Sequence, residues 1–187
     1  MKKISSLFIT VFFLNFTNAE AKDVLGLNLC GNVSTEDVKN SLNKNQAILD
    51  KVEVEEELNE ITILTKDYKV ADKAAEVSFS IYKGKLYKIR FQDGDIVSDI
   101  LKSKYGLLRR EKVNGVVLED NFYYNSRDKD IDIFETYGEP NPAFGLPGYH
   151  GWHYATYLCK SIDKMRSIDI EKLNNKKQLQ KKGASQL

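Results

Sequence analysis

The sequence has 187 residues, with 28 basic and 27 acidic side chains, so its formal net charge is +1 at pH 7. This balance excludes nucleic acid as a predicted partner, because binding to phosphates needs a concentrated positive field. Hydrophobic residues make up 42% and charged residues 29% of the chain, which is typical of a globular protein.

The N-terminal segment has the pattern of a cleavable secretory signal peptide over residues 1–21. Lys2 and Lys3 precede the mostly apolar stretch 4–16, and Ala19-Glu20-Ala21 supplies the small residues that signal peptidase needs. The apolar stretch of about 13 residues is shorter than the roughly 20 needed to span a bilayer, so no stable membrane anchor is expected. Cleavage is predicted near Ala19 or Ala21, and the mature protein is expected in a bacterial periplasm.

The chain contains two cysteines, Cys30 and Cys159. Export places them in an oxidising compartment, and this favours a disulfide between them. A reactive thiol or a metal ligand is the alternative reading. Lipid attachment is not expected, because Cys30 lies well downstream of the apolar stretch and follows Leu29.

The first half of the mature chain predicts one helix followed by strands. Ser34-Thr35-Glu36-Asp37 has N-cap chemistry, and Val38 and Leu42 fall on one helical face before the polar segment 43–45. The Lys83-Gly84 turn joins two runs of alternating apolar residues, which is the clearest hairpin signal in the chain. The predicted strands are Ile48–Glu57, Leu58–Thr65, Val77–Tyr82 and Leu86–Phe91.

The second half repeats this order. Asp93-Gly94-Asp95 is predicted to cap a helix that spans Ile96–Tyr105, and Gly106 occupies the position of a C-terminal glycine cap. Met165, Ile168 and Leu173 indicate a short helix, which leads into a basic flexible tail over residues 176–187. The predicted strands are Val113–Leu118, Asn121–Tyr124, Ile131–Tyr137 and Trp152–Ile162.

The predicted organisation is therefore a single α+β domain over residues 22–175. Its two similar halves cover about 22–92 and 93–175, and their helices begin about 60 residues apart. Each half would lay one helix across antiparallel strands, so the helices are expected to pack on one face of a sheet.

This order of elements, with a helix that ends in Lys102-Ser103-Lys104-Tyr105-Gly106 after a hairpin, resembles the SmpA/BamE and β-lactamase-inhibitor-protein type of fold. The resemblance covers most of the mature chain and rests on the order of elements. It implies a binding protein rather than an enzyme, because members of that group assist envelope assembly or inhibit secreted enzymes. The sequence departs from the assembly lipoproteins, which carry a lipid-attachment cysteine.

The segment Gly138–His153 differs in composition from the rest of the chain. It contains all three prolines, both histidines and the only tryptophan, so a long loop is predicted. Long loops in compact domains are often functional, and aromatic side chains dominate binding hot spots. The candidate residues for binding a protein partner are Phe144, Tyr149, His150 and Trp152. The alternative is that these aromatic side chains cover the end of the sheet.

No catalytic residue, cofactor or metal is predicted. The spacing of His150 and His153 matches no recognised zinc pattern, and the sequence contains no Gly-x-Ser-x-Gly motif. The acidic run Glu53–Glu60 indicates either an electronegative patch or a solvated strand edge.

These observations predict a soluble periplasmic module that binds another protein. An inhibitor or immunity protein against an envelope-acting effector is the most concrete form of this hypothesis. An envelope-assembly or stress accessory protein is the alternative, and a hydrolase with an unrecognised site around the two histidines is a third. Neither the partner's identity nor the oligomeric state follows from the sequence.

Overall fold

A computed structural model describes residues 23–70, 72–114, 117–140 and 151–184 of the chain. The predicted signal peptide and most of the predicted binding loop lie outside these residues. The helical elements are α1 (Thr35–Asn45), η1 (Glu56–Leu58), α2 (Asp95–Tyr105) and α3 (Lys160–Ala184). The strands are β1 (Asp23–Val24), β2 (Leu27–Asn28), β3 (Ile48–Glu55), β4 (Glu60–Val70), β5 (Lys73–Tyr82), β6 (Lys85–Phe91), β7 (Leu107–Asn114), β8 (Val117–Tyr124), β9 (Ile131–Pro140) and β10 (Trp152–Cys159).

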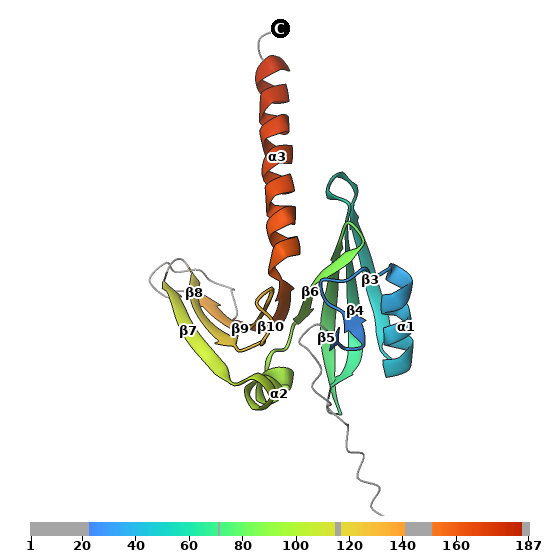
Figure 1. The fold of residues 1–187 in the computed structure, drawn as a ribbon, viewed down its shortest axis with the longest axis vertical. Coiled ribbons are helices and arrows are strands. Elements are labelled where there is room, and N and C mark those ends of the chain that lie inside the picture. Colours follow the sequence, from blue (N-terminus) through green and yellow to red (C-terminus); the bar gives the residue numbers. More distant parts are fainter. Residues whose placement is uncertain (1–22, 71, 115–116, 141–150, 185–187) are drawn as a thin grey trace, which may run out of the picture.

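The centre of the fold is an eight-stranded sheet in which every neighbouring pair is antiparallel, with the order β3-β4-β5-β6-β10-β9-β8-β7. The α+β class is thereby confirmed. In the chain, α1 precedes β3–β6 and α2 precedes β7–β10. The two sets of four strands meet in the middle of the sheet, where β6 pairs with β10 (Figure 1). The same order, one helix followed by four strands, therefore occurs once on each side of the middle.

Local signals account for both short helices. Ser34 and Asp37 form a reciprocal capping box at the start of α1, because the Ser34 hydroxyl accepts from the Asp37 backbone and the Asp37 carboxylate accepts from the Ser34 backbone. Gly106 ends α2 with a φ of +68°, as its predicted cap position requires. Helix α2 begins within the predicted Asp93-Gly94-Asp95 segment, with Gly94 as the N-cap residue, but no side chain forms a capping hydrogen bond there.

The helices α1 and α2 pack on the same face of the sheet. Ser41 of α1 contacts the hydroxyl of Tyr68, whose ring packs on Phe79 at 6.3 Å between centroids. Tyr105 at the end of α2 packs edge-on against Tyr157, also at 6.3 Å. Phe79 and Tyr157 share one row across the sheet, because both are register partners of the same residue of β6. Side chains in one row point to the same face.

The third helix contacts the opposite face. Arg166 of α3 donates to Glu60 at 2.6 Å, and Tyr82 donates to Asp169 at 2.5 Å. Glu60 and Tyr82 are register partners, and Tyr82 is three residues from Phe79, so the two side chains face away from α1. The expectation that the helices pack on one face is therefore not confirmed for α3.

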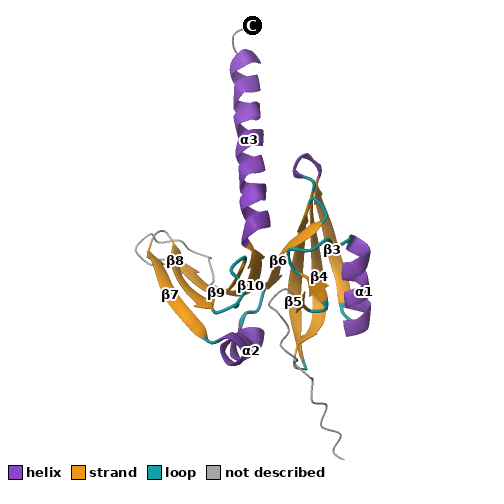
Figure 2. Ribbon diagram, viewed as in Figure 1, coloured by secondary structure: helices purple, strands orange, loops and turns teal. Residues whose placement is uncertain are grey.

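Helix α3 also replaces most of the expected flexible tail. It continues without interruption from Lys160 to Ala184, and its C-terminal half extends beyond the sheet (Figures 1 and 2). Asp169 attaches the middle of α3 to the sheet, because its carboxylate accepts hydrogen bonds from Tyr82 and Lys83. These hydrogen bonds lower the pKa of the Asp169 carboxyl to about 2. Lys177 pairs with Glu57 further along the helix. No helix among the described residues has both the length and the apolar character needed to cross a membrane.

Several predicted strand boundaries were wrong, and β4, β5 and β9 each extend beyond the range expected for them. A single strand was expected at Val113–Leu118, but β7 ends at Asn114 and β8 begins at Val117, so the segment holds the end of a hairpin. The final strand ends at Cys159 rather than Ile162, because α3 starts directly after it. In the first half, β3 stops at Glu55 and the acidic residues that follow form η1.

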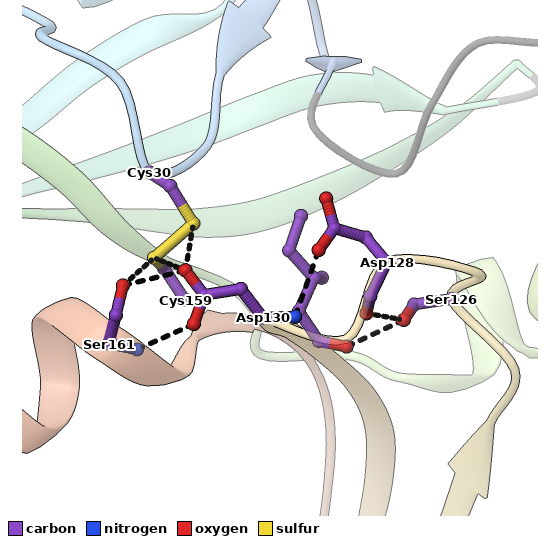
Figure 3. The surroundings of a disulfide bond; sticks show 7 residues. Cys30, Ser126, Asp128, Asp130, Cys159 and Ser161 are labelled. Carbon is purple, nitrogen blue, oxygen red and sulfur yellow. Dashed lines mark hydrogen bonds between the residues drawn. A yellow bond between two sulfur atoms is a disulfide. The ribbon is translucent and has the colours of Figure 1, made fainter.

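The predicted disulfide between Cys30 and Cys159 is confirmed, with 5.5 Å between the two Cα atoms. It joins the segment after β2 to the last residue of β10. Asp130 lies beside it (Figure 3), with Oδ2 3.7 Å from Sγ of Cys30 and 3.6 Å from Sγ of Cys159. The same carboxylate accepts from the hydroxyl of Ser161 at 2.6 Å and from its backbone N–H at 2.9 Å. Asp130 therefore caps the start of α3 next to the bridge.

Candidate protein-binding site

The structure describes one of the four predicted binding residues. Trp152 is the first residue of β10 and is partly buried. Phe144, Tyr149 and His150 lie outside the described residues, and the hypothesis that their loop binds a partner stays a prediction. The described part of the chain instead contains a concentration of aromatic side chains on the sheet itself, around Trp152.

These side chains form what we call the aromatic face, on the side of the sheet opposite α1 and α2. Their positions follow from the strand register, in which one row of directly paired residues crosses five strands. The row runs from β6 to β7 through Arg90, Thr156, Phe134, Tyr123 and Arg109. Tyr154 and Trp152 extend the aromatic face along β10, because alternate residues of a strand share one side.

Aromatic and cationic groups pack together across this face. The rings of Tyr123 and Phe134 lie 5.6 Å apart between centroids. The guanidinium of Arg109 lies 4.0 Å from the centroid of the Tyr123 ring, and that of Arg90 lies 5.1 Å from the centroid of the Tyr154 ring. Such contacts hold flat side chains in fixed orientations, so the aromatic face is organised before any partner arrives.

A groove of about 530 Å³ follows the aromatic face across β6, β10, β9 and β8. Its lining combines aromatic rings with hydroxyl, amide and charged groups, which is the mixture that protein-binding sites use for affinity and specificity. The lining residues are Arg90, Glu119, Asn121, Phe134, Thr136, Trp152, Tyr154 and Thr156.

Trp152 lies in this groove because its neighbour across the sheet is a glycine. Trp152 and Gly138 are register partners in the β10–β9 pair. A Cβ atom on Gly138 would be only 2.1 Å from Cε2 of the indole, which is far below any real contact distance. The absence of a side chain at Gly138 therefore gives the Trp152 ring its position against the strand.

Gly138→Ala is expected to displace the Trp152 ring from β9, because the new methyl group and the indole cannot occupy the same space. The chain has a single tryptophan, so its fluorescence reports this displacement directly. We expect the emission spectrum to change, with about 1–3 kcal/mol lost from the free energy of unfolding. Gly84→Ala is the control for the emission alone: its φ of +74° makes an alanine there cost stability through backbone strain, but no atom lies within 4 Å of a Cβ, so the emission of the folded protein should stay unchanged. An unaltered spectrum in Gly138→Ala would contradict the packing described.

A second groove, of about 760 Å³, lies at the α2 side of the same strand ends and includes His153. The His153 side chain is only 10% exposed, and its ring is stacked on Tyr137 at 3.7 Å between centroids. Nδ1 lies 2.8 Å from Asp95, and Nε2 faces the interior, 3.8 Å from the buried carboxylate of Glu135. The imidazole therefore lies between the exposed carboxylate of Asp95 and the buried carboxylate of Glu135, and its buried Nε2 has no hydrogen-bond partner among the described residues.

The group Cys30, Asp130 and Cys159 is the one cluster among the described residues with donor atoms close enough for a metal ion, within 4.8 Å of one another. Both sulfur atoms are used in the disulfide, which leaves Asp130 as a cap for α3. The geometry supports the structural reading of this cluster.

Sequence reasoning missed most of the aromatic face. Arg90, Tyr123, Phe134 and Tyr154 were assigned to predicted strands without regard to which side of the sheet they occupy. The usable signal was the two-residue period of a strand, which places Trp152, Tyr154 and Thr156 on one side of β10 and Ala155 and Tyr157 on the other. Alternation in one strand does not reveal which other strands lie beside it, and the row across β6, β10, β9 and β8 depends on that order.

Comparison of the chain with protein-family models, with curated proteins and with solved structures found no match. The functional reading therefore rests on the geometry and chemistry of the aromatic face.

Proposed function

We propose that this chain is an exported, periplasmic module that binds another protein through the aromatic face, and that it acts as an inhibitor or immunity protein against an envelope-acting effector. The aromatic face is the observation that carries the proposal. Tyrosine, tryptophan and arginine are the residue types most enriched in binding hot spots, and here they share one groove.

The chemistry of the groove suits a protein partner. Tyrosine and tryptophan provide a large contact area at a low entropic cost, because each has few rotatable bonds. Thr136, Asn121 and Thr156 add hydroxyl and amide groups that fix orientation. The contacts of Arg90 with Tyr154 and of Arg109 with Tyr123 organise the surface in advance, which lowers the entropy lost on binding.

The periplasmic part of the proposal is supported by the signal-peptide pattern in the sequence and by the disulfide, which is compatible with an oxidising compartment.

The test is capture from the native envelope with matched variants of the mature protein. Phe134→Ala and Tyr154→Ala should each weaken partner binding by about thirtyfold, since truncation of a hot-spot aromatic side chain costs at least about 2 kcal/mol. Ile48→Ala on the edge strand β3 removes an exposed apolar side chain far from the groove and should leave the affinity unchanged.

The captured partner then decides the class of function. Protection of cells that produce the partner as a toxin would support the immunity role. A partner from the envelope-assembly machinery would favour the accessory role. Equal affinities for wild type and both aromatic variants would exclude the aromatic face as the binding surface.

A further inference from the structure

Arg90 on β6 carries a hydrogen-bond donor that the described residues leave unused. Its Nε atom is buried, yet no acceptor lies within hydrogen-bond distance of it. The guanidinium packs against the ring of Tyr154 and forms no ion pair with a carboxylate in the described part of the chain. An unsatisfied buried donor is costly, and more so when it belongs to a charged group. Arg90 also lines the groove, so a segment bound there would lie beside its guanidinium.

The other arginines beside the sheet are compensated within the protein. Arg109 pairs with Glu111 at 2.8 Å, Arg110 pairs with Asp120, and Arg166 pairs with Glu60 at 2.6 Å. Arg90 therefore differs from Arg109 and Arg110 on the same sheet and from Arg166 on α3, each of which pairs with a carboxylate.

A second cation intensifies the positive potential at this end of the groove. Lys88 is two residues before Arg90 on the same strand, so both side chains lie on the aromatic face. Burial lowers the pKa of Lys88, and the positive charges of Arg90 and Arg166 lower it further, although Glu60 and Asp163 act in the opposite direction. The positive charges thus outnumber the carboxylates that face them here.

The single carboxylate in the groove lining lies at the other end. Glu119 belongs to β8, and β10 and β9 separate that strand from β6. Three strand spacings amount to about 14 Å, which is too far for an ion pair with Arg90. The groove is therefore positive at β6 and negative at β8, and this polarity favours one orientation of a bound segment.

We infer that the aromatic face takes an acidic segment of its protein partner, with one Asp or Glu carboxylate pairing with the guanidinium of Arg90. Arginine and carboxylate groups pair with two parallel hydrogen bonds when the geometry allows, and such a pair is stronger in a partly buried groove than on an open surface. Thr156, the register partner of Arg90, is largely buried and belongs to the lining of the groove beside the same position. This inference rests on the proposed function and specifies the chemistry of the partner.

The test uses two short peptides as probes. The first is acetyl-Gly-Asp-Ala-Glu-Gly-amide, and the second is its uncharged counterpart with Asn and Gln. Trp152 lines the same groove and is the only tryptophan, so the NMR signal of its indole N–H reports occupancy. We expect the acidic peptide to shift this signal in a saturable manner and the amide peptide to bind roughly tenfold more weakly, because it lacks the charge-assisted bonds.

Two matched variants localise the effect. Arg90→Gln should remove the preference for the acidic peptide, and Arg110→Gln, on the opposite side of the sheet, should retain it. Equal binding of the two peptides to wild-type protein would overturn the inference, and this comparison holds even if Arg90→Gln does not fold. An equal loss in Arg110→Gln would also overturn it, since the preference would then reflect overall charge.

The outcomes separate this inference from the proposed function. If the acidic peptide binds at Arg90 while substitutions on the aromatic face leave partner capture unchanged, the proposed function fails and the carboxylate site stands. If partner capture requires Phe134 and Tyr154 while the two peptides bind equally, the proposed function stands and the acidic partner segment is excluded.

Discussion

Replacing Cys30 and Cys159 together by serine is expected to lower the free energy of unfolding by about 4–5 kcal/mol. The bridge spans 129 residues, and closing a loop of that length removes a large amount of conformational freedom from the unfolded chain. A loss of this size is a large part of the 5–15 kcal/mol that typically stabilises a domain, so the variant should unfold at a much lower urea concentration.

Reduction provides the control for this prediction. Wild-type protein treated with a reductant should unfold at the same midpoint as the double-serine variant, and the reductant should not change the variant. If oxidised and reduced wild-type protein unfold at the same midpoint, the bridge does not contribute to stability, and Asp130 with the sheet would account for the attachment of the N-terminal segment.

Glu60→Ala is expected to cost about 3–5 kcal/mol, because it removes one partner of a buried ion pair. Glu60 is 7% exposed and accepts from Tyr87 at 2.5 Å and from Arg166 at 2.6 Å. Burial raises the pKa of Tyr87, and the hydrogen bond to Glu60 raises it further, so the phenol remains a donor that needs this carboxylate. The Arg166 side chain is 27% exposed, and solvent can replace part of the lost interaction, so the lower end of the range is expected.

Urea unfolding and limited proteolysis with trypsin measure the two consequences of Glu60→Ala. The unfolding midpoint should fall, and cleavage within α3 should become faster because Arg166 no longer anchors the helix. Glu57→Ala is the matched control, since Glu57 pairs with Lys177 and both side chains are more than half exposed. Exposed pairs contribute about 0–1 kcal/mol, so an equal effect of the two substitutions would contradict the buried role of Glu60.

The parts of the fold that sequence reasoning predicted correctly depend on local chemistry. The capping box of Ser34 and Asp37 fixes the start of α1 within four residues of chain. The hairpin of β5 and β6 follows from alternating apolar residues and a Lys83-Gly84 turn, in which both residues have positive φ. Each of these signals is complete within a short segment, so no knowledge of distant partners was needed.

The parts of the fold that sequence reasoning did not predict depend on contacts between residues that are far apart in the sequence. Glu60 belongs to an acidic run that was interpreted as a solvated edge or an electronegative patch, but its partner Arg166 is 106 positions away and brings the carboxylate into the interior. The aromatic face is similar, because Arg90 and Tyr154 meet only through the pairing of β6 with β10. The candidate site was therefore sought in the loop of unusual composition, and Trp152 is the one predicted binding residue that lies in the groove.

The pairing of β6 with β10 has an evolutionary consequence. These are the fourth strands of two sets with the same order of elements, and they pair antiparallel, with Ile89 opposite Tyr157 and Arg90 opposite Thr156. Two equivalent strands that pair antiparallel are related to each other by a two-fold axis, as are the two subunits of a symmetric dimer. A single ancestral half could thus have closed its exposed edge strand against a second copy, as a homodimer. Fusion of two such genes would make the interface permanent and free each copy to change separately. The disulfide between Cys30 and Cys159 and the contacts of α3 with Glu60 and Tyr82 each join one half to the other, and neither has a counterpart in the reverse direction among the described residues.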